Sequence, residues 1–553
     1  MSSAKSVYDA VIVGAGAGGA AAAWALTRQG WSVLLLDAGP QFDPQIDYRA
    51  AQADWEGAFP EKTGSQGRHT FGELQRLDTN WQTLRSWNHV QGMLNTSERR
   101  IPVGYQHVRG IGGSTLHFTG EAHRLNPRSM KLRSQFGVAA DWPLGYAELE
   151  PYYLQAEQLL GVAGPHEDRR CPRSSPFPYP AHRRSHASQY LAEGFARRGL
   201  GFIENSLAVL PEGRPGRAAC NYCGCCLKGC PRMDKGSADV TFIRDALTSG
   251  RCTIRPNTTV LRIVAGPQDK ISGILVKDLA GEHLIETAVL VLAAGAIETP
   301  RLLLNSADAR NPQGLANESG QVGQNFMETL AWTSNVLSQR PLGSHRGLPV
   351  DSICWDFNHP DAIPGVIGGC RFSTSVAESD LIGPINYAKR VVKGWGSQHK
   401  LAMRASFGRV LSLSGIGESL PNPGSYVDLD PLVKDGYGLP LARIHSQLDD
   451  MALRRLNFMA QTCREIFASL KESPPFEEFG TYDMFASTHV FGTCRMGDSP
   501  GDSVVDAACR SHRWRNLLIT DGSIFPSSGG GESPSLTIQA LALRAIKLLT
   551  EQK

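Results

Sequence analysis

Short apolar runs, each followed by glycines, set the pattern of the first forty residues. Residues 7–13 (VYDAVIV) are mostly apolar and β-branched, as in a buried parallel strand. A glycine cluster over 14–19 follows at once, and an alanine-rich stretch to about Gln29 predicts a helix that Gly30 ends. Residues 31–36 predict a second strand, which Asp37 follows. The pattern predicts a strand–helix–strand unit.

The glycines of this unit have the spacing GxGxxG, and Asp37 lies 18 residues after Gly19. Glycines at Gly14, Gly16 and Gly19 allow the backbone to approach a pyrophosphate at the helix N-terminus, and Asp37 can accept from a ribose hydroxyl. A close helix–sheet crossing would use the same glycines. With strand, helix, second strand and acid all in place, we expect a dinucleotide site, for FAD or for NAD.

Similar apolar runs return much later in the chain. Residues 289–292 predict another buried strand, which leads into AAGAIETPRLLL. Residues 517–520 predict a strand followed by Asp521 and a helix from about Leu536. Between the two ends of the chain, the glycine-rich loop 109–120 (RGIGGSTLHFTG) allows a second close backbone approach.

Composition places the chain among globular proteins. Its 553 residues predict two or three domains, with 41% hydrophobic and 20% charged residues. The net charge of +3 is too small for nucleic-acid binding driven by bulk electrostatics. The sequence has no run of about 18 apolar residues, the length that a membrane span needs. The uncharged segment 11–26 lacks the basic flank of a signal peptide. We therefore expect a cytoplasmic protein, in which cysteines are thiols or ligands.

At this point the sequence resembles the glucose–methanol–choline (GMC) family of FAD oxidoreductases, nearly end to end. The dinucleotide fingerprint, the GGST loop, AAGAIETPRLLLNS, VGQNFME, HVFGTCRMG and DGSIFPSSGG occur in the family's order. Residues 141–153 are similar to the branch of pyranose oxidases and bacterial FAD glucose dehydrogenases. The resemblance implies an α/β (α+β) fold, with a Rossmann-like FAD-binding domain and a substrate domain built on an antiparallel sheet.

The resemblance also implies that both domains are discontinuous. The FAD-binding domain takes residues 1–130, 215–310 with the cysteine-rich loop, and 485–553 with the catalytic histidine. Residues 131–214 form a connecting and lid segment, and 311–484 form the substrate-binding domain. The residues implied in FAD binding are Gly14, Gly16, Gly19, Asp37, Gly112, Gly113, Ser114, His117, Asp521 and Gly522.

His117 has two interpretations. In the pyranose-oxidase pattern the histidine at this position is bonded covalently to the flavin methyl group, whereas related dehydrogenases have a histidine there without a bond. A packing and hydrogen-bonding role beside the flavin is the alternative.

Oxidation of an alcohol by FAD requires a base that is neutral near pH 7 and lies within about 3 Å of the hydroxyl, which favours histidine. His489 begins HVFGTCRMG, where the family has its catalytic histidine. The family's second polar residue is Asn or His, but Ser533 stands at that position here. We expect His489 to be the base and Ser533 to orient the substrate hydroxyl, with Glu532 or a water as an additional contributor. Glu328, where many relatives have His, receives no role.

Five of the 12 cysteines lie between Cys220 and Cys230. The spacing C-x2-C-x2-C-x3-C-P over Cys220, Cys223, Cys226 and Cys230 is typical of iron–sulfur ligands in ferredoxins. Some dehydrogenases of the sugar-oxidising branch resemble this chain in having a cluster at a comparable insertion. Zinc bound by the same thiolates, or free thiols or a disulfide, are the alternatives.

Together these features predict oxidation of a CH–OH group, most favourably a sugar or glycoside hydroxyl to a ketone or lactone. We expect a dehydrogenase that passes electrons to an external acceptor, with a protein or a small subunit as a candidate partner. A GMC oxidase of a non-sugar alcohol that uses O2, and a non-catalytic FAD-binding or electron-transfer subunit, are the alternatives.

Overall fold

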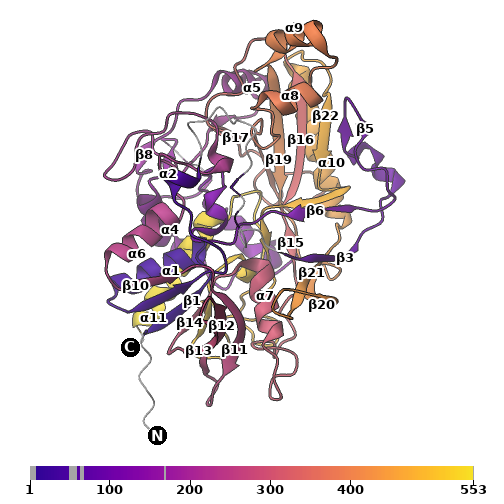
Figure 1. The fold of residues 1–553 in the computed structure, drawn as a ribbon. Helices are drawn as coiled ribbons and strands as arrows, with labels where there is room; N and C mark the ends of the chain where they lie inside the picture. The colour runs from indigo at the N-terminus through magenta and orange to yellow at the C-terminus, as the bar shows by residue number, and fades with distance from the viewer. Residues whose placement is uncertain are drawn as a thin grey trace.

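A five-stranded parallel sheet forms the base of the molecule (Figure 1). The computed structural model describes residues 8–48, 59–60, 62, 68–166, 168 and 170–551. The strand order is β10-β2-β1-β14-β25, with bounds β1 (Ala10–Val13), β2 (Val33–Leu36), β10 (Cys252–Arg255), β14 (Leu290–Leu292) and β25 (Leu517–Ile519). Strands β1 and β2 are buried at every position, because both faces of a parallel sheet are covered.

Helices from both ends of the chain complete this layer. Helix α1 (Ala17–Arg28) contacts α11 (Ser535–Glu551), and α11 contacts α4 (Tyr146–Leu160). A three-stranded antiparallel sheet, β11-β12-β13, lies beside it, with bounds β11 (Thr259–Ala265), β12 (Ile271–Asp278) and β13 (Gly281–Glu286).

An eight-stranded sheet forms the second layer, in the order β5-β4-β22-β16-β19-β18-β17-β9. Its bounds are β4 (Trp87–Asn88), β5 (Gly92–Met93), β9 (Ile203–Glu204), β16 (Leu330–Leu337), β17 (Ser352–Cys354), β18 (Cys370–Thr374), β19 (Val410–Gly417) and β22 (Glu477–Gly480). All its pairs are antiparallel. Helix α10 (Asp450–Ser469) packs across β16 and β19.

The remaining elements are short or lie at the edges. One small sheet consists of β20 (Tyr426–Lys434), β21 (Pro440–Ser446) and β3 (Thr70–Leu74). Three two-stranded sheets pair β6 (Ile101–Tyr105) with β23 (Met484–Ser487), β15 (Met327–Glu328) with β24 (Val490–Phe491), and β7 (Ala163–Gly164) with β8 (Tyr179–Pro180). The other helices are α2 (Pro44–Asp47), α3 (Leu132–Phe136), α5 (His186–Arg197), α6 (Arg244–Thr248), α7 (Gly295–Asn305), α8 (Pro384–Arg390) and α9 (Gly396–Ser406). Among the helices of the described chain, none combines the length and apolarity that crossing a bilayer requires.

This architecture confirms the predicted fold class, and the strand ends differ from expectation by a few residues. Strand β1 begins at Ala10 and β2 at Val33, because Asp9 and Ser32 bond through their side chains just before the ladder starts. Val7 lies outside the described residues. The five parallel strands fall within residues 1–130, 215–310 and 485–553, but the large sheet also takes β4, β5 and β9 from outside residues 311–484.

Candidate functional site

A cavity of about 520 Å³ lies between the parallel sheet and the eight-stranded sheet. On one side it is lined at the carboxyl ends of parallel strands, by Val13 of β1, Leu36 of β2 and Asp521 after β25. On the other side, side chains from β16, β18 and β19 line it. Ligands of open α/β sheets bind at the carboxyl ends of the strands, so this cavity is the candidate site.

The turn after β1 is built for close approach. Gly14 has φ +99°, and a Cβ there would lie 2.4 Å from the carbonyl oxygen of Ala293. A Cβ at Gly19 would lie 1.9 Å from the carbonyl oxygen of Gly14. Gly16 is different, because the nearest atom to its Cβ position is Gly113 Cα at 3.9 Å. Gly14 and Gly16 line the cavity, whereas Gly19 supports the turn from behind.

Asp37 lies at the end of β2, buried and on the cavity wall. Its Oδ2 accepts from the backbone N–H of Ala15 and its Oδ1 from that of Gly39, both at 2.9 Å. Burial raises the pKa of this carboxyl, against the lowering effect of these bonds. The carboxylate is fixed beside the glycine turn, and each oxygen keeps a lone pair for a further donor.

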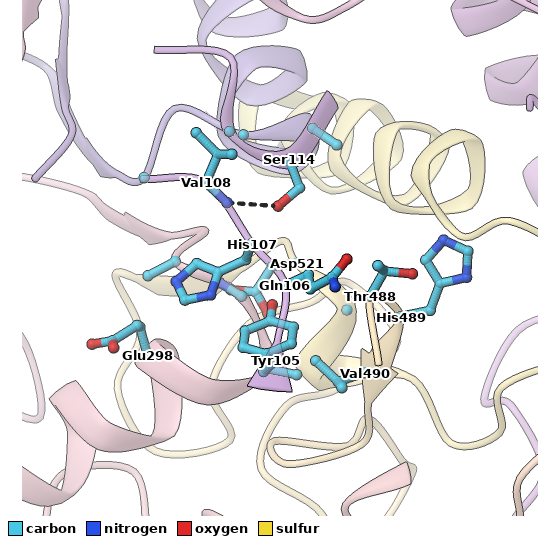
Figure 2. Close-up of a pocket in the computed structure, with 18 of the residues that line it drawn as sticks. Tyr105, Gln106, His107, Val108, Ser114, Glu298, Thr488, His489, Val490 and Asp521 are labelled. Atoms are coloured by element: carbon cyan, nitrogen blue, oxygen red, sulfur yellow. Dashed lines mark hydrogen bonds between the residues drawn. The ribbon is translucent and has the colours of Figure 1, made fainter. Parts of the chain in front are cut away.

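The second glycine loop meets the first. A Cβ at Gly113 would lie 2.7 Å from Gly16 Cα, which joins the two loops backbone to backbone. Ser114 lines the cavity, and its Oγ accepts from the N–H of Val108 at 3.3 Å (Figure 2). Gly112 does not line the cavity; its φ of +110° turns the loop against Leu116.

Asp521 ties the end of β25 to α7. Its Oδ2 accepts from the N–H of Gly295 at 2.9 Å and from Thr299 Oγ1 at 2.6 Å, and its Oδ1 accepts from the N–H of Ser523. Asp521 and Gly522 both line the cavity, and Figure 2 labels Asp521 among the lining residues.

Two histidines on the cavity wall have ring nitrogens without a hydrogen-bond partner in the described chain: Nε2 of His117, and both nitrogens of His107. Burial lowers the pKa of each imidazole to about 4, so both are neutral at pH 7. His107 stacks on Tyr105 with ring centroids 4.5 Å apart. No motif in the sequence marks His107, which precedes the glycine loop by two residues.

His489 lies in the two-residue gap between β23 and β24 and faces the cavity. Burial lowers the pKa of its imidazole to about 4; the charge of Glu121 opposes this shift and that of Arg371 adds to it. The ring is therefore neutral at pH 7 and can accept a proton, as a general base must.

Glu121 and Arg371, both buried and both lining the cavity, form an ion pair of 2.7 Å. Asn205 Nδ2 donates to Glu121 Oε1 at 3.0 Å, and Ser533 Oγ donates to Oε2 at 2.9 Å. The Arg371 charge and these donors hold the pKa of Glu121 at about 2, against burial. The sequence analysis did not name either residue, although Glu121 directly follows the second glycine loop.

Ser533 is thus part of a network rather than an isolated hydroxyl. Its N–H donates to His123 Nδ1 at 3.1 Å, while its hydroxyl proton is committed to Glu121 and its oxygen lone pairs stay free to accept. Glu532 does not line the cavity, since it bonds to the Asn126 backbone, Asn358 and Arg170 instead.

Glu328 forms a buried bidentate pair with Arg100, at 2.6 and 2.7 Å. Glu328 is the last residue of β15 and does not line the cavity.

Glu378, in the turn after β18, adds a second carboxyl to this end of the cavity. Desolvation by the surrounding protein raises the pKa of its carboxyl to about 7, and the Glu121 charge acts in the same direction. The catalytic end therefore has one acid paired with Arg371 and one that changes charge near neutral pH.

The metal site predicted at the cysteine loop stays a prediction. No group of three or more His, Cys, Asp or Glu side chains within the described ranges is arranged to hold a metal ion. Cys226 is buried against Leu207, Val209 and neighbouring apolar residues, whereas Cys223 is exposed at the surface. Cys220 packs against the same apolar cluster as Cys226. The thiols of Cys220, Cys223, Cys226 and Cys230 are all free, and burial raises the pKa of the Cys220 thiol to about 12.

The cavity fits a flavin dinucleotide. The backbone at Gly16 leaves room for a pyrophosphate. The fixed carboxylate of Asp37 can bind a ribose. The unpartnered imidazole nitrogens of His107 and His117 could bond to a polar ring system. In the described chain, the cysteine thiols do not fit an iron–sulfur cluster as they are placed here.

Comparisons with known proteins agree with this geometry. Two family models described as GMC oxidoreductase match residues 182–331 and 421–542, and a model of an NAD(P)-binding Rossmann-like domain matches residues 12–82. The 2-methyl-1,2-propanediol dehydrogenase of Mycolicibacterium austroafricanum is 26% identical, over 99% of this chain and 95% of its own length. The fructose dehydrogenase large subunit of Gluconobacter japonicus is 28% identical, over 99% and 98%.

Among solved structures, pyridoxine 4-oxidase from Mesorbium loti has a TM-score of 0.64 at 18% identity, covering 98% of this chain and 99% of the other, which shows a shared fold. With the Rossmann unit, the antiparallel sheet and a cavity between them all in place, the chain belongs to the GMC oxidoreductase family, whose members act on CH–OH groups.

Proposed function

We propose that this protein is an FAD-dependent dehydrogenase that oxidises a hydroxyl group of a sugar or glycoside to the ketone or lactone. The observation that carries the proposal is a neutral His489 facing the same cavity as the dinucleotide turn. The named activities of the two relatives above, on fructose and on a small diol, support alcohol oxidation with an acceptor other than oxygen.

FAD, when bound, supplies the acceptor for the hydride that leaves the alcohol carbon. Gly14, Gly16 and Asp37 would hold its nucleotide half, and Gly113, Ser114 and Asp521 lie where its other half would reach. His489 accepts the hydroxyl proton, because its ring is neutral well below pH 7.

Ser533 orients the substrate. Because its own proton is donated to Glu121, its oxygen presents lone pairs to the cavity and would accept from a hydroxyl next to the reacting one. A neighbouring hydroxyl is present in sugars and vicinal diols and absent from simple alcohols, which favours polyhydroxylated substrates.

Two finer hypotheses remain proposals with direct tests. Flavin that stays attached to the denatured protein, and is released in a His117→Ala variant, would support the covalent bond at His117. Iron and acid-labile sulfide in the purified protein would support a cluster at Cys220, Cys223, Cys226 and Cys230. Binding of such a cluster would require these thiols to move from the positions described above. The catalytic roles above do not depend on either result.

Anaerobic stopped-flow measurement of flavin reduction with a panel of sugars, glycosides, diols and simple alcohols tests the proposal. We expect sugars or glycosides to bleach the flavin fastest, and His489→Asn to slow reduction by about 10²–10⁴-fold while flavin remains bound. Bleaching by non-sugar alcohols alone, with rapid reoxidation by O2, would favour the oxidase alternative. If no compound of the panel reduces the flavin, the alternative of a non-catalytic FAD-binding or electron-transfer subunit is favoured.

A further inference from the structure

Helices α8 and α9 form a projecting hairpin over residues 384–409, which we call the α8–α9 hairpin. Figure 1 shows it at the end of the molecule opposite the parallel sheet, beyond β16 and β19. None of its residues lines the cavity. Its role therefore lies outside the chemistry described above.

The inner side of the hairpin explains how it is attached. In α9 the less exposed positions are His399, Ala402, Met403 and Ser406, spaced as one face of a helix. Ala402 and Met403 pack against a small apolar cluster that includes Tyr387 of α8. One face of α9 is thus used for packing, and no residue of this helix is fully buried.

The outer side carries large apolar side chains that the fold does not cover. Trp395 is 89% exposed, Leu401 57% and Ile385 52%. Leu401 lies between Lys400 and Arg404 on the outward face of α9, and Trp395 immediately precedes that helix. Exposed apolar residues grouped in one place mark an interaction site, whereas single ones do not.

The charge of the hairpin has one sign. Residues 384–409 contain six Lys and Arg and no Asp or Glu, in a chain whose net charge is only +3. Arg390 pairs with Glu477, but no ion pair within the described residues involves Lys389, Lys393, Lys400 or Arg404. The outer face therefore combines unneutralised positive charge with exposed apolar groups.

We propose that the outer face of the α8–α9 hairpin is a peripheral docking surface for a membrane with anionic lipid headgroups. A Trp and a Leu among lysines are the side chains that insert at a headgroup boundary while the ammonium groups meet anionic lipids. A protein partner is disfavoured, because three exposed apolar side chains offer far less than the ~800 Å² per partner that a stable protein interface buries.

Co-sedimentation of the full-length, flavin-loaded protein with vesicles tests this surface. We expect binding to vesicles of phosphatidylcholine and phosphatidylglycerol in equal parts, weak binding to pure phosphatidylcholine, and loss of binding at high salt, where charge attraction is screened. Trp395 emission should shift to shorter wavelength on binding, and this shift should be absent in Trp395→Ser.

Two sets of substitutions separate the charge and apolar contributions. Lys389→Gln/Lys393→Gln/Lys400→Gln should weaken binding by roughly 100-fold, at about fivefold per charge. Trp395→Ser/Leu401→Ser should weaken it by at least about tenfold. Leu279→Ser is the matched control, because Leu279 is fully exposed in the β12–β13 turn at the other end of the molecule and should not change binding.

Every variant should keep its flavin spectrum and its rate of flavin reduction, since the hairpin does not reach the cavity. The proposal is overturned if the wild-type protein does not sediment with the anionic vesicles at low salt, if it binds neutral vesicles equally, or if both sets of variants bind as the control does. Binding of this face to an acidic protein but not to anionic vesicles would also overturn it.

Discussion

Substitution of Glu121 by Gln is the sharpest test of the network around His489. Glutamine preserves the shape of the side chain but removes the charge opposite Arg371, and its single oxygen can accept from Asn205 or from Ser533 but not from both. The variant therefore removes the buried ion pair together with one of the two hydrogen bonds that Glu121 accepts.

The cost follows from the pKa of Glu121. A folded-state pKa of about 2 against an ordinary value of 4.5 contributes roughly 3 kcal/mol to stability at pH 7. Breaking one buried ion pair typically costs about 3–5 kcal/mol, so the two arguments agree. Because the folded pKa is depressed, this contribution is present above about pH 4.5 and is lost as pH falls toward 2.

Thermal unfolding at pH 7 measures the effect. With about 2.1 cal/mol/K of unfolding entropy per residue, a chain of 553 residues unfolding as one unit loses about 1 °C in Tm per kcal/mol. We expect Glu121→Gln to melt about 3–4 °C below the wild type, with a smaller difference at more acidic pH. Flavin reduction should also slow, since the remaining Arg371 charge lowers the basicity of His489 further.

Asp361→Asn is the control. Asp361 pairs with Arg128 at 2.7 Å, as closely as Glu121 pairs with Arg371, but both partners are more than 40% exposed. A surface pair contributes little, so its Tm should change by less than about 1 °C. If Glu121→Gln and Asp361→Asn melt at the same temperature, the argument from burial is refuted.

Three further predictions concern the cavity. Glu378→Gln should raise the Tm at pH 8 but not at pH 5, because the raised pKa of Glu378 makes its ionised form unfavourable in the folded state. An equal change in Tm at pH 5 and pH 8 would contradict this. In that variant, flavin reduction should stay nearly constant from about pH 5.5 to 8, since His489 loses its proton near pH 4; a transition near pH 6.5 would refute the assignment. Gly113→Ala should yield protein without flavin, because the new Cβ would lie 2.7 Å from Gly16 Cα, whereas Gly250→Ala, also at positive φ but with open space around it, should retain flavin absorbance.

Local sequence patterns predicted the parts of the site that are local in the chain. The turn after β1 and the acid after β2 follow from glycine spacing and apolar runs, because a strand–helix–strand unit is formed by neighbours in sequence. His489 and Ser533 followed from their place in family motifs, and both line the cavity.

The partners of those residues could not be predicted in the same way. Arg371 and Glu378 lie on or after a strand of the antiparallel sheet, and nothing in that segment marks them as facing a cavity formed by distant loops. Glu121 had a weak local signal, an acid at the end of a glycine loop. The cysteine spacing stays a prediction, because a regular pattern does not determine how packing arranges the thiols, and no metal-holding group is found among the described residues.

The parallel sheet also limits when this protein can become functional during synthesis. Strand β14 pairs with β1 across nearly 280 residues, and β25, which completes the sheet, begins only at Leu517. A nascent chain that ends before this point lacks β25, Asp521 and α11, so the cavity has no closed wall for a cofactor. Long-range pairing of this kind is slow and exposes apolar strand edges in the interval. Cofactor capture should therefore follow synthesis of β25 and α11, and the yield of active protein should depend on chaperones and on the flavin supply more than on the stability of the finished fold.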